Sequence, residues 1–194
     1  MAETADLYLG LVHYPVYNKH MQVVTTAVTN FDIHDIARSC ATYNAKKYYI
    51  VHPLAVQREI VAKILDFWQN GYGKIYNPDR NQALKTVELA QDIKSAAQDI
   101  TAIAGCPPIT VTTGAGECAG AISCAELRAI AQTATSPLFL LFGTGWGIEK
   151  SAMSGFDYIL QPIKGASPYN HLSVRSAAAI VLDRLAGEKW WANE

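Results

Sequence analysis

The chain has 194 residues, and half of them are hydrophobic, which is enough for one packed core and excludes wholesale disorder. Its 16 lysine and arginine residues nearly balance its 17 aspartate and glutamate residues, and the formal net charge is −1. This balance excludes a global basic field of the kind that drives non-specific nucleic-acid binding. Any contact with phosphate must therefore come from a local cluster of cations.

The four cysteines do not show the spacing of a metal site or of a disulfide framework. We expect them to be small apolar residues in a reducing cytosol. Residues 1–6 lack the cationic region of a signal peptide, and no window approaches the roughly 20 apolar residues of a membrane span. The sequence predicts a cytoplasmic protein with one domain over residues 1–194 and no membrane segment.

In the first third, predicted strands alternate with predicted helices. Residues 7–13 and 47–51 are short apolar runs typical of buried strands. Asp32 is the predicted cap of a helix with apolar residues at i, i+3 and i+4 spacing. Pro53 opens a further predicted helix that ends near Asn70. The face of this helix that we expect to be buried consists of Val56, Ile60, Ile64 and Phe67.

Residues 84–104 allow two interpretations, one long helix or a strand at 86–90 followed by a helix from Asp92 to Ala104. We favour the second because it continues the alternation. The later predicted elements are strands at 109–113, 137–142 and 157–161, and helices from Ser123, in a capping box with Glu126, and from Ser173 to Leu185. This order predicts an α/β fold, a mostly parallel sheet with helices on both faces.

Three loops in the C-terminal half follow predicted strands, at residues 112–116, 143–147 and 162–172. In parallel sheets ligands bind beyond the carboxyl ends of the strands, so these loops predict a small-molecule site. The glycines at 143, 145 and 147 do not form a dinucleotide fingerprint, because the third comes one position too early. This spacing disfavours a nucleotide-dependent oxidoreductase.

The order of these segments resembles the C-terminal motifs of the SPOUT, or trefoil-knotted, RNA methyltransferases. The motifs are Leu141-Phe-Gly143, then Gln161-Pro-Ile-x-Gly165, then Leu172-x-Val174 running into a helix rich in alanine. Residues 32–45, with Asp32 six residues before Arg38, resemble the superfamily's first motif. The resemblance covers nearly the whole chain. It is closest to the bacterial SAM-dependent RNA methyltransferase domain related to tRNA (guanine-N1) methyltransferases.

This resemblance implies a trefoil knot, with the knot and a site for S-adenosylmethionine at about residues 108–185. It further implies an RNA substrate, tRNA or rRNA, and a homodimer formed through the knot. We expect Trp190 and Trp191 to lie at a dimer contact because exposing them is costly. The implied cofactor-binding residues are Thr112, Thr113, Gly114, Leu141, Gly143, Gly147, Leu160, Ile163 and Leu172.

Three residues are candidates for catalysis. By the resemblance, Arg38 activates the acceptor or holds its phosphate. Arg175 contacts RNA or a partner subunit, or else forms a surface ion pair. His171 can take a proton, or else is a loop histidine bonded to backbone. The resemblance also places the loop containing His13 toward the substrate, although such loops are commonly only solvated.

Some positions depart from the 2′-O-ribose branch of the superfamily. Gly145, His171 and Ser173 stand where that branch has Glu, Ser and Asn, and Asp32 stands where it has Asn. The methylated atom therefore stays open. A catalytically silent RNA-binding or scaffold module that kept the fold is the alternative function.

Overall fold

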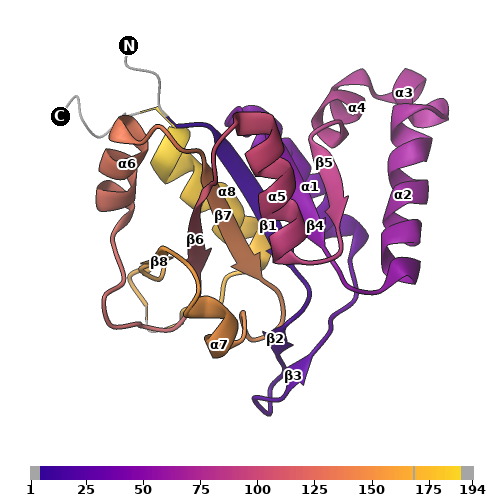
Figure 1. Ribbon diagram of the computed structural model, residues 1–194. Coiled ribbons are helices and arrows are strands. Elements are labelled where there is room, and N and C mark those ends of the chain that lie inside the picture. Colours follow the sequence, from indigo (N-terminus) through magenta and orange to yellow (C-terminus); the bar gives the residue numbers. More distant parts are fainter. Residues whose placement is uncertain (1–4, 168, 189–194) are drawn as a thin grey trace.

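The computed structural model describes residues 5–167 and 169–188 and contains a six-stranded, wholly parallel sheet (Figure 1). Every residue of the first strand is buried, as expected for a strand covered on both faces. From one edge to the other the strands are β5 (Val87–Ala90), β4 (Lys47–Val51), β1 (Leu7–Val12), β7 (Leu138–Gly143), β6 (Ile109–Thr113) and β8 (Tyr158–Leu160).

Helices cover both faces of the sheet, so the predicted α/β class is confirmed. In Figure 1, α5 lies in front of the sheet, and α1 and α8 lie behind it. Two apolar clusters fill the space between these layers, one on each face. The helices are α1 (Asn30–Thr42), α2 (Ala55–Gln69), α3 (Tyr72–Tyr76), α4 (Pro78–Leu84), α5 (Ile93–Ala104), α6 (Cys124–Thr133), α7 (Lys150–Met153) and α8 (Val174–Ala186).

The interpretation of residues 84–104 as strand and helix is confirmed, and the single long helix is wrong. Asp92 caps α5, and its side chain and that of Ser95 each accept the other's backbone N–H. Gly105 ends the helix in the left-handed region, where glycine is preferred. The capping box predicted for Ser123 and Glu126 is confirmed in the same way at the start of α6.

The predicted start of α1 is wrong by three residues. Thr29, not Asp32, is the cap, and its hydroxyl oxygen accepts the backbone N–H of Asp32 at 3.2 Å. Asp32 lies in the first turn, where a carboxylate is stabilised by the helix dipole. Its buried carboxylate accepts the Thr29 hydroxyl at one oxygen and binds a cation from α8 at the other.

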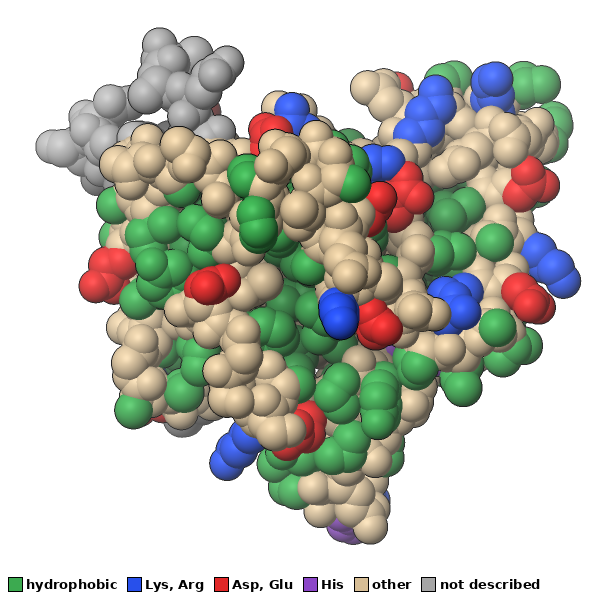
Figure 2. Space-filling model, in the orientation of Figure 1, with side chains coloured by type: hydrophobic (Ala, Val, Ile, Leu, Met, Phe, Trp, Pro, Cys, Tyr) green, Lys and Arg blue, Asp and Glu red, His purple; other side chains and the backbone are tan. Residues whose placement is uncertain are grey.

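The predicted buried face of α2 is also wrong. Val56, Ile60 and Phe67 are 57%, 49% and 48% exposed, and only Ile64 of that face is partly buried. Val61 and Leu65 are buried instead, because α2 lies beyond the edge strand β5 and packs inward with its other side. Figure 2 shows hydrophobic side chains at the surface in the region of α2 and α3.

Several short elements have no sequence prediction. They are α3, α4 and the two-residue strands β2 (Val16–Tyr17) and β3 (Val23–Val24), which pair antiparallel. Within residues 5–167 and 169–188 no helix is both long and apolar enough to cross a membrane. Trp190 and Trp191 lie outside the described residues. The trefoil knot stays a prediction.

Candidate functional site

The loops that follow β6 and β8 are joined at the carboxyl edge of the sheet. Gln161 donates its backbone N–H to the Ile122 carbonyl oxygen at 2.8 Å, so residue 122 lies beside the end of β8. The Asn170 side chain donates to the Ala115 carbonyl oxygen at 2.8 Å. The exposed Lys164 and Glu117 form an ion pair at 2.6 Å. These contacts bring residues 112–117 together with residues 160–170.

Strand register places most of the predicted cofactor residues side by side. Thr112 on β6 lies opposite Leu141 on β7, and Thr113 lies opposite Leu160 on β8. Gly143 ends β7 opposite Val12. The remaining predicted residues lie in the adjoining loops, and these are Gly114, Gly147, Ile163 and the half-exposed Leu172.

The Thr112 hydroxyl has an unmet hydrogen bond. Its side chain is fully buried, and its Oγ1 has no partner within the described part of the chain. Burying a hydroxyl without a partner costs about 1–3 kcal/mol. Two residues further along the chain, a Cβ atom added to Gly114 would meet nothing within 4 Å, and the same holds at Gly147. An unmet hydrogen bond in the strand and open space in the loop that follows it fit a ligand that brings its own hydrogen-bonding groups.

The glycine loop, residues 143–147, is held against β2. Trp146 donates its N–H to the Tyr17 carbonyl oxygen at 2.8 Å, and Tyr17 donates to Gly147 at 2.9 Å. Gly145 has a φ of +58°, and a Cβ there would lie 2.6 Å from the Tyr17 carbonyl oxygen. Only glycine therefore fits at this position.

A polar cluster of His13, Thr26 and Thr144 lies at the glycine loop. The sequence did not predict it. His13 is fully buried rather than solvated, and its Nδ1 lies 3.1 Å from the hydroxyl of Thr26. Burial, with a contribution from the neighbouring His52, lowers the pKa of His13 to about 4. His13 is therefore neutral near pH 7. No sequence signal points to the cluster, because its members are far apart along the chain.

Arg175 forms an ion pair at the start of α8. Its Nη1 donates to Asp32 at 3.0 Å, and its Nε lies 3.4 Å from Asp35. The guanidinium also lies 5.5 Å from the centre of the Phe31 ring. Of the alternatives for Arg175, the ion pair is the one observed, and it ties the first turns of α1 and α8 together.

Arg38 and His171 are not brought together with each other. Arg38 is exposed on α1, about 12 Å along the helix from its first residue. Its guanidinium forms no hydrogen bond or ion pair with the residues that the structure describes. His171 is exposed in the loop before α8, edge-on to the Tyr169 ring at 5.5 Å.

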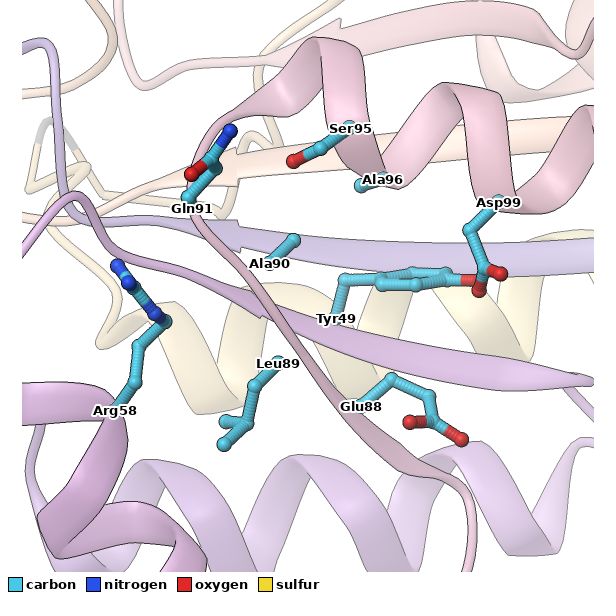
Figure 3. A pocket seen from close by; sticks show the side chains of 9 residues that line it. All are labelled: Tyr49, Arg58, Glu88, Leu89, Ala90, Gln91, Ser95, Ala96 and Asp99. Carbon is cyan, nitrogen blue, oxygen red and sulfur yellow. The ribbon is translucent and has the colours of Figure 1, made fainter. Parts of the chain in front are cut away.

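Two open hollows lie along β5, at the edge of the sheet opposite β8. The hollow in Figure 3, of about 450 Å³, is flanked by Arg58, Tyr49 and Asp99. Tyr49 donates to Asp99 at 2.6 Å, and Arg58 donates to the carbonyl oxygens of residues 52 and 53. Because these polar groups already bind one another, the hollow shows no need for a ligand comparable to that at Thr112. A second hollow of about 420 Å³ lies on the other side of β5.

The relatives of this chain include proteins that are named tRNA methyltransferases. The chain is similar to a Nitratidesulfovibrio vulgaris protein named tRNA (guanine-N(1)-)-methyltransferase, with 42% identity over 183 residues. The match covers 94% of this chain but only 42% of that relative, so the chain spans about two fifths of its length. An uncharacterized protein of Aquifex aeolicus is 38% identical over 93% of this chain and 88% of its own length.

Among solved structures, the fold is similar to the Aquifex aeolicus TrmH/SpoU tRNA modifying enzyme. The TM-score is 0.56 at 14% identity, over 99% of this chain and 79% of that one. A family model described as SAM-dependent RNA methyltransferase matches residues 6–187. The chain therefore belongs to the SAM-dependent RNA methyltransferases, with a SPOUT-type fold.

Proposed function

We propose that this chain methylates tRNA, with S-adenosylmethionine bound where the ends of β6, β7 and β8 meet. The observation that carries the proposal is the buried, unpaired hydroxyl of Thr112 at the end of β6, two residues before the open space at Gly114. S-adenosylmethionine is the methyl donor of the family and supplies an electrophilic methyl group when bound. The chain must therefore hold the donor, orient the acceptor and help its proton to leave.

Nine residues are proposed to hold the cofactor, in three groups. Apolar strand ends with exposed backbone groups suit a flat adenine with a hydrogen-bonding edge. One wall consists of Thr112, Thr113 and Gly114, the floor of Leu141, Gly143 and Gly147, and the adenine-binding loop of Leu160, Ile163 and Leu172.

Arg38 is the proposed residue for the acceptor, by its match to the family's first motif. A guanidinium keeps its proton at neutral pH, so Arg38 is not a general base. It can hold a phosphate or stabilise negative charge on the acceptor atom. His171 lies in the loop before α8, can accept a proton at its imidazole, and is exposed and so accessible to RNA. Arg175 positions α8 against α1 through Asp32.

The proposal of tRNA as substrate rests on the names of the longer relatives, of which this chain matches about two fifths. We further propose a homodimer formed through the knot region, as the SPOUT resemblance implies. The dimer is checked by measuring the molar mass in solution by light scattering, and a monomer at micromolar concentration contradicts it.

Two measurements test the proposed function. Calorimetric titration with S-adenosylhomocysteine is expected to show one site per chain, and no binding at millimolar ligand contradicts the cofactor site. Incubation with tRNA and methyl-labelled S-adenosylmethionine, followed by nucleoside mapping, is expected to yield one labelled nucleoside. Binding without transfer to tRNA or rRNA would instead support a silent RNA-binding module.

A further inference from the structure

We propose that Thr26 is a positioning residue that holds the glycine loop, residues 143–147, in the shape that receives the cofactor. Thr26 lies between β3 and α1, outside the family motifs and far in sequence from the glycine loop. This inference rests on the proposed function, because it takes the glycine loop to line the cofactor site.

A chain of hydrogen bonds runs through the Thr26 hydroxyl, and only one assignment of donors and acceptors fits it. The Thr144 hydroxyl donates to the Val12 carbonyl oxygen at 3.0 Å, so its only proton is used there. The Thr26 hydroxyl, 2.5 Å away, must therefore donate to Thr144. It then accepts from Nδ1 of His13 at 3.1 Å, which makes His13 the tautomer with its proton on Nδ1. The donors thus point in one direction, from the loop after β1 to the glycine loop.

The backbone of Thr26 is held as firmly as its side chain. Nδ1 of His52 accepts the N–H of Leu54 at 3.1 Å, so its other nitrogen, Nε2, carries the proton. That nitrogen donates to the Thr26 carbonyl oxygen at 3.0 Å. The Thr26 N–H donates to the His13 carbonyl oxygen at 3.1 Å. Every polar group of Thr26 is therefore used, and residues after β1, β4 and β7 meet on it.

Thr26 also contacts the loop that it orients. A Cβ added to Gly145 would lie 3.6 Å from the Thr26 methyl group, so this methyl borders the glycine. Thr144 is the residue between Gly143 and Gly145, and its N–H also donates to the Val12 carbonyl oxygen at 3.1 Å. Without the Thr26 hydroxyl, the Thr144 hydroxyl loses the hydrogen bond that it accepts from Thr26. The glycines on each side, which lack side chains to hold them, then gain freedom.

The sharpest test replaces Thr26 by the isosteric Val, which keeps the methyl group of Thr26 and replaces its hydroxyl by a second methyl. Thr26→Ser, which keeps the hydroxyl, is the rescue. Thr25→Val is the matched control, because Thr25 is the exposed neighbour. Amide hydrogen exchange in the free protein is expected to rise about tenfold at residues 144–147 in Thr26→Val, and to stay unchanged in the other two variants.

Affinity for S-adenosylhomocysteine, measured by calorimetry, is expected to fall about tenfold in Thr26→Val and to recover in Thr26→Ser. Equal exchange in Thr26→Val and Thr25→Val overturns the inference, as does faster exchange with unchanged affinity. If Thr26→Val does not fold, Thr144→Val removes the same bond from the other side. A wild-type protein that binds no S-adenosylhomocysteine contradicts the proposed function, whereas the exchange measurement still decides whether Thr26 holds the loop.

Discussion

Two threonine hydroxyls at the carboxyl edge of the sheet differ in how their hydrogen bonds are met. Thr26 Oγ1 has two partners, His13 and Thr144, in a chain of fixed direction. Thr112 is fully buried, whereas Thr26 is partly buried, and Thr112 Oγ1 has no partner among the described residues. The hydroxyl of Thr26 forms all its hydrogen bonds within the protein, so it holds its neighbours in place. We call Thr26 and the glycine loop, residues 143–147, the braced region, and residues 112–117 the unbraced region. The Thr112 hydroxyl retains an unmet hydrogen bond. The buried Nε2 of His13 also has no partner among the described residues, so the unmet bond at Thr112 points to a ligand only together with the open space at Gly114.

The glycines of the two regions also differ, in how closely other atoms pack against them. Gly145, in the braced region, is pressed against the Tyr17 carbonyl oxygen, whereas Gly114, in the unbraced region, borders open space. Glycine therefore serves close packing in one loop and ligand access in the other. A glycine-rich loop in the sequence therefore does not by itself show whether its glycines serve packing or ligand binding.

The largest expected effect is that of Gly145→Ala on the braced region. The new Cβ meets a backbone oxygen at 2.6 Å, at a φ of +58°, so we expect a loss of about 3 kcal/mol in the free energy of unfolding. The control is Gly147→Ala, which has positive φ but no contact within 4 Å and should lose about 1–2 kcal/mol. Urea denaturation measures both, and equal losses would show that the contact with Tyr17 is unimportant.

The second effect is a pH dependence that arises from His13. Its pKa is about 4 in the folded protein and 6.5 when unfolded, so the unfolded chain binds the proton first as the pH falls. Stability is therefore complete above pH 6.5, and it falls by about 3 kcal/mol as the pH approaches 4. In His13→Asn, which keeps a donor but does not titrate, the curve of unfolding free energy should be flatter in this window. Parallel curves for the two proteins would refute the assignment.

The third effect concerns Thr112 and has the opposite sign. Thr112→Val removes an unpaired hydroxyl, so we expect the free protein to gain about 1 kcal/mol of stability while its affinity for S-adenosylhomocysteine falls. Thr110→Val is the comparison, because the Thr110 hydroxyl donates to Asp157 at 2.6 Å and its loss should destabilise. Thermal unfolding and calorimetry measure the two properties. A destabilised Thr112→Val would mean that the hydroxyl already has a partner.

The smallest expected effect on stability is that of Gly114→Ala. The new methyl group meets no atom within 4 Å, so the free energy of unfolding should change by less than about 0.5 kcal/mol. We expect affinity for S-adenosylhomocysteine to fall, because the methyl group occupies the proposed ligand space. Gly116→Ala, in the same loop and also without contacts, is the control, and equal affinities in the two variants would move the ligand away from Gly114.

The order of strands and helices is readable from the sequence because buried parallel strands are continuous apolar runs separated by capping and turn residues. Asp92 and Ser123 start helices as predicted. The inner face of α2 was not predictable, since periodicity shows which side chains are apolar but not which are covered. Val56 and Phe67 are exposed because the sheet ends at β5, and no described strand extends the sheet to cover the outer side of α2.

The candidate site was predictable as a set of loops, by its motifs, but not in its hydrogen bonding. That Thr112 lacks a partner depends on side chains of β7 and β8, which sequence cannot place atom by atom. The network around Thr26 draws on residues after three different strands. Such contacts between distant residues leave no local pattern to recognise.

The central place of β1 constrains how the chain can assemble. β1 pairs with β4, about 40 residues later, and with β7, which begins at Leu138. During synthesis one edge of β1 can be covered early, while the other stays open until residues 138–143 have emerged. Contacts so distant in sequence slow folding, and an open apolar strand edge favours misassembly. The pairing that places His13 beside Thr144 therefore also delays completion of the sheet until most of the chain exists.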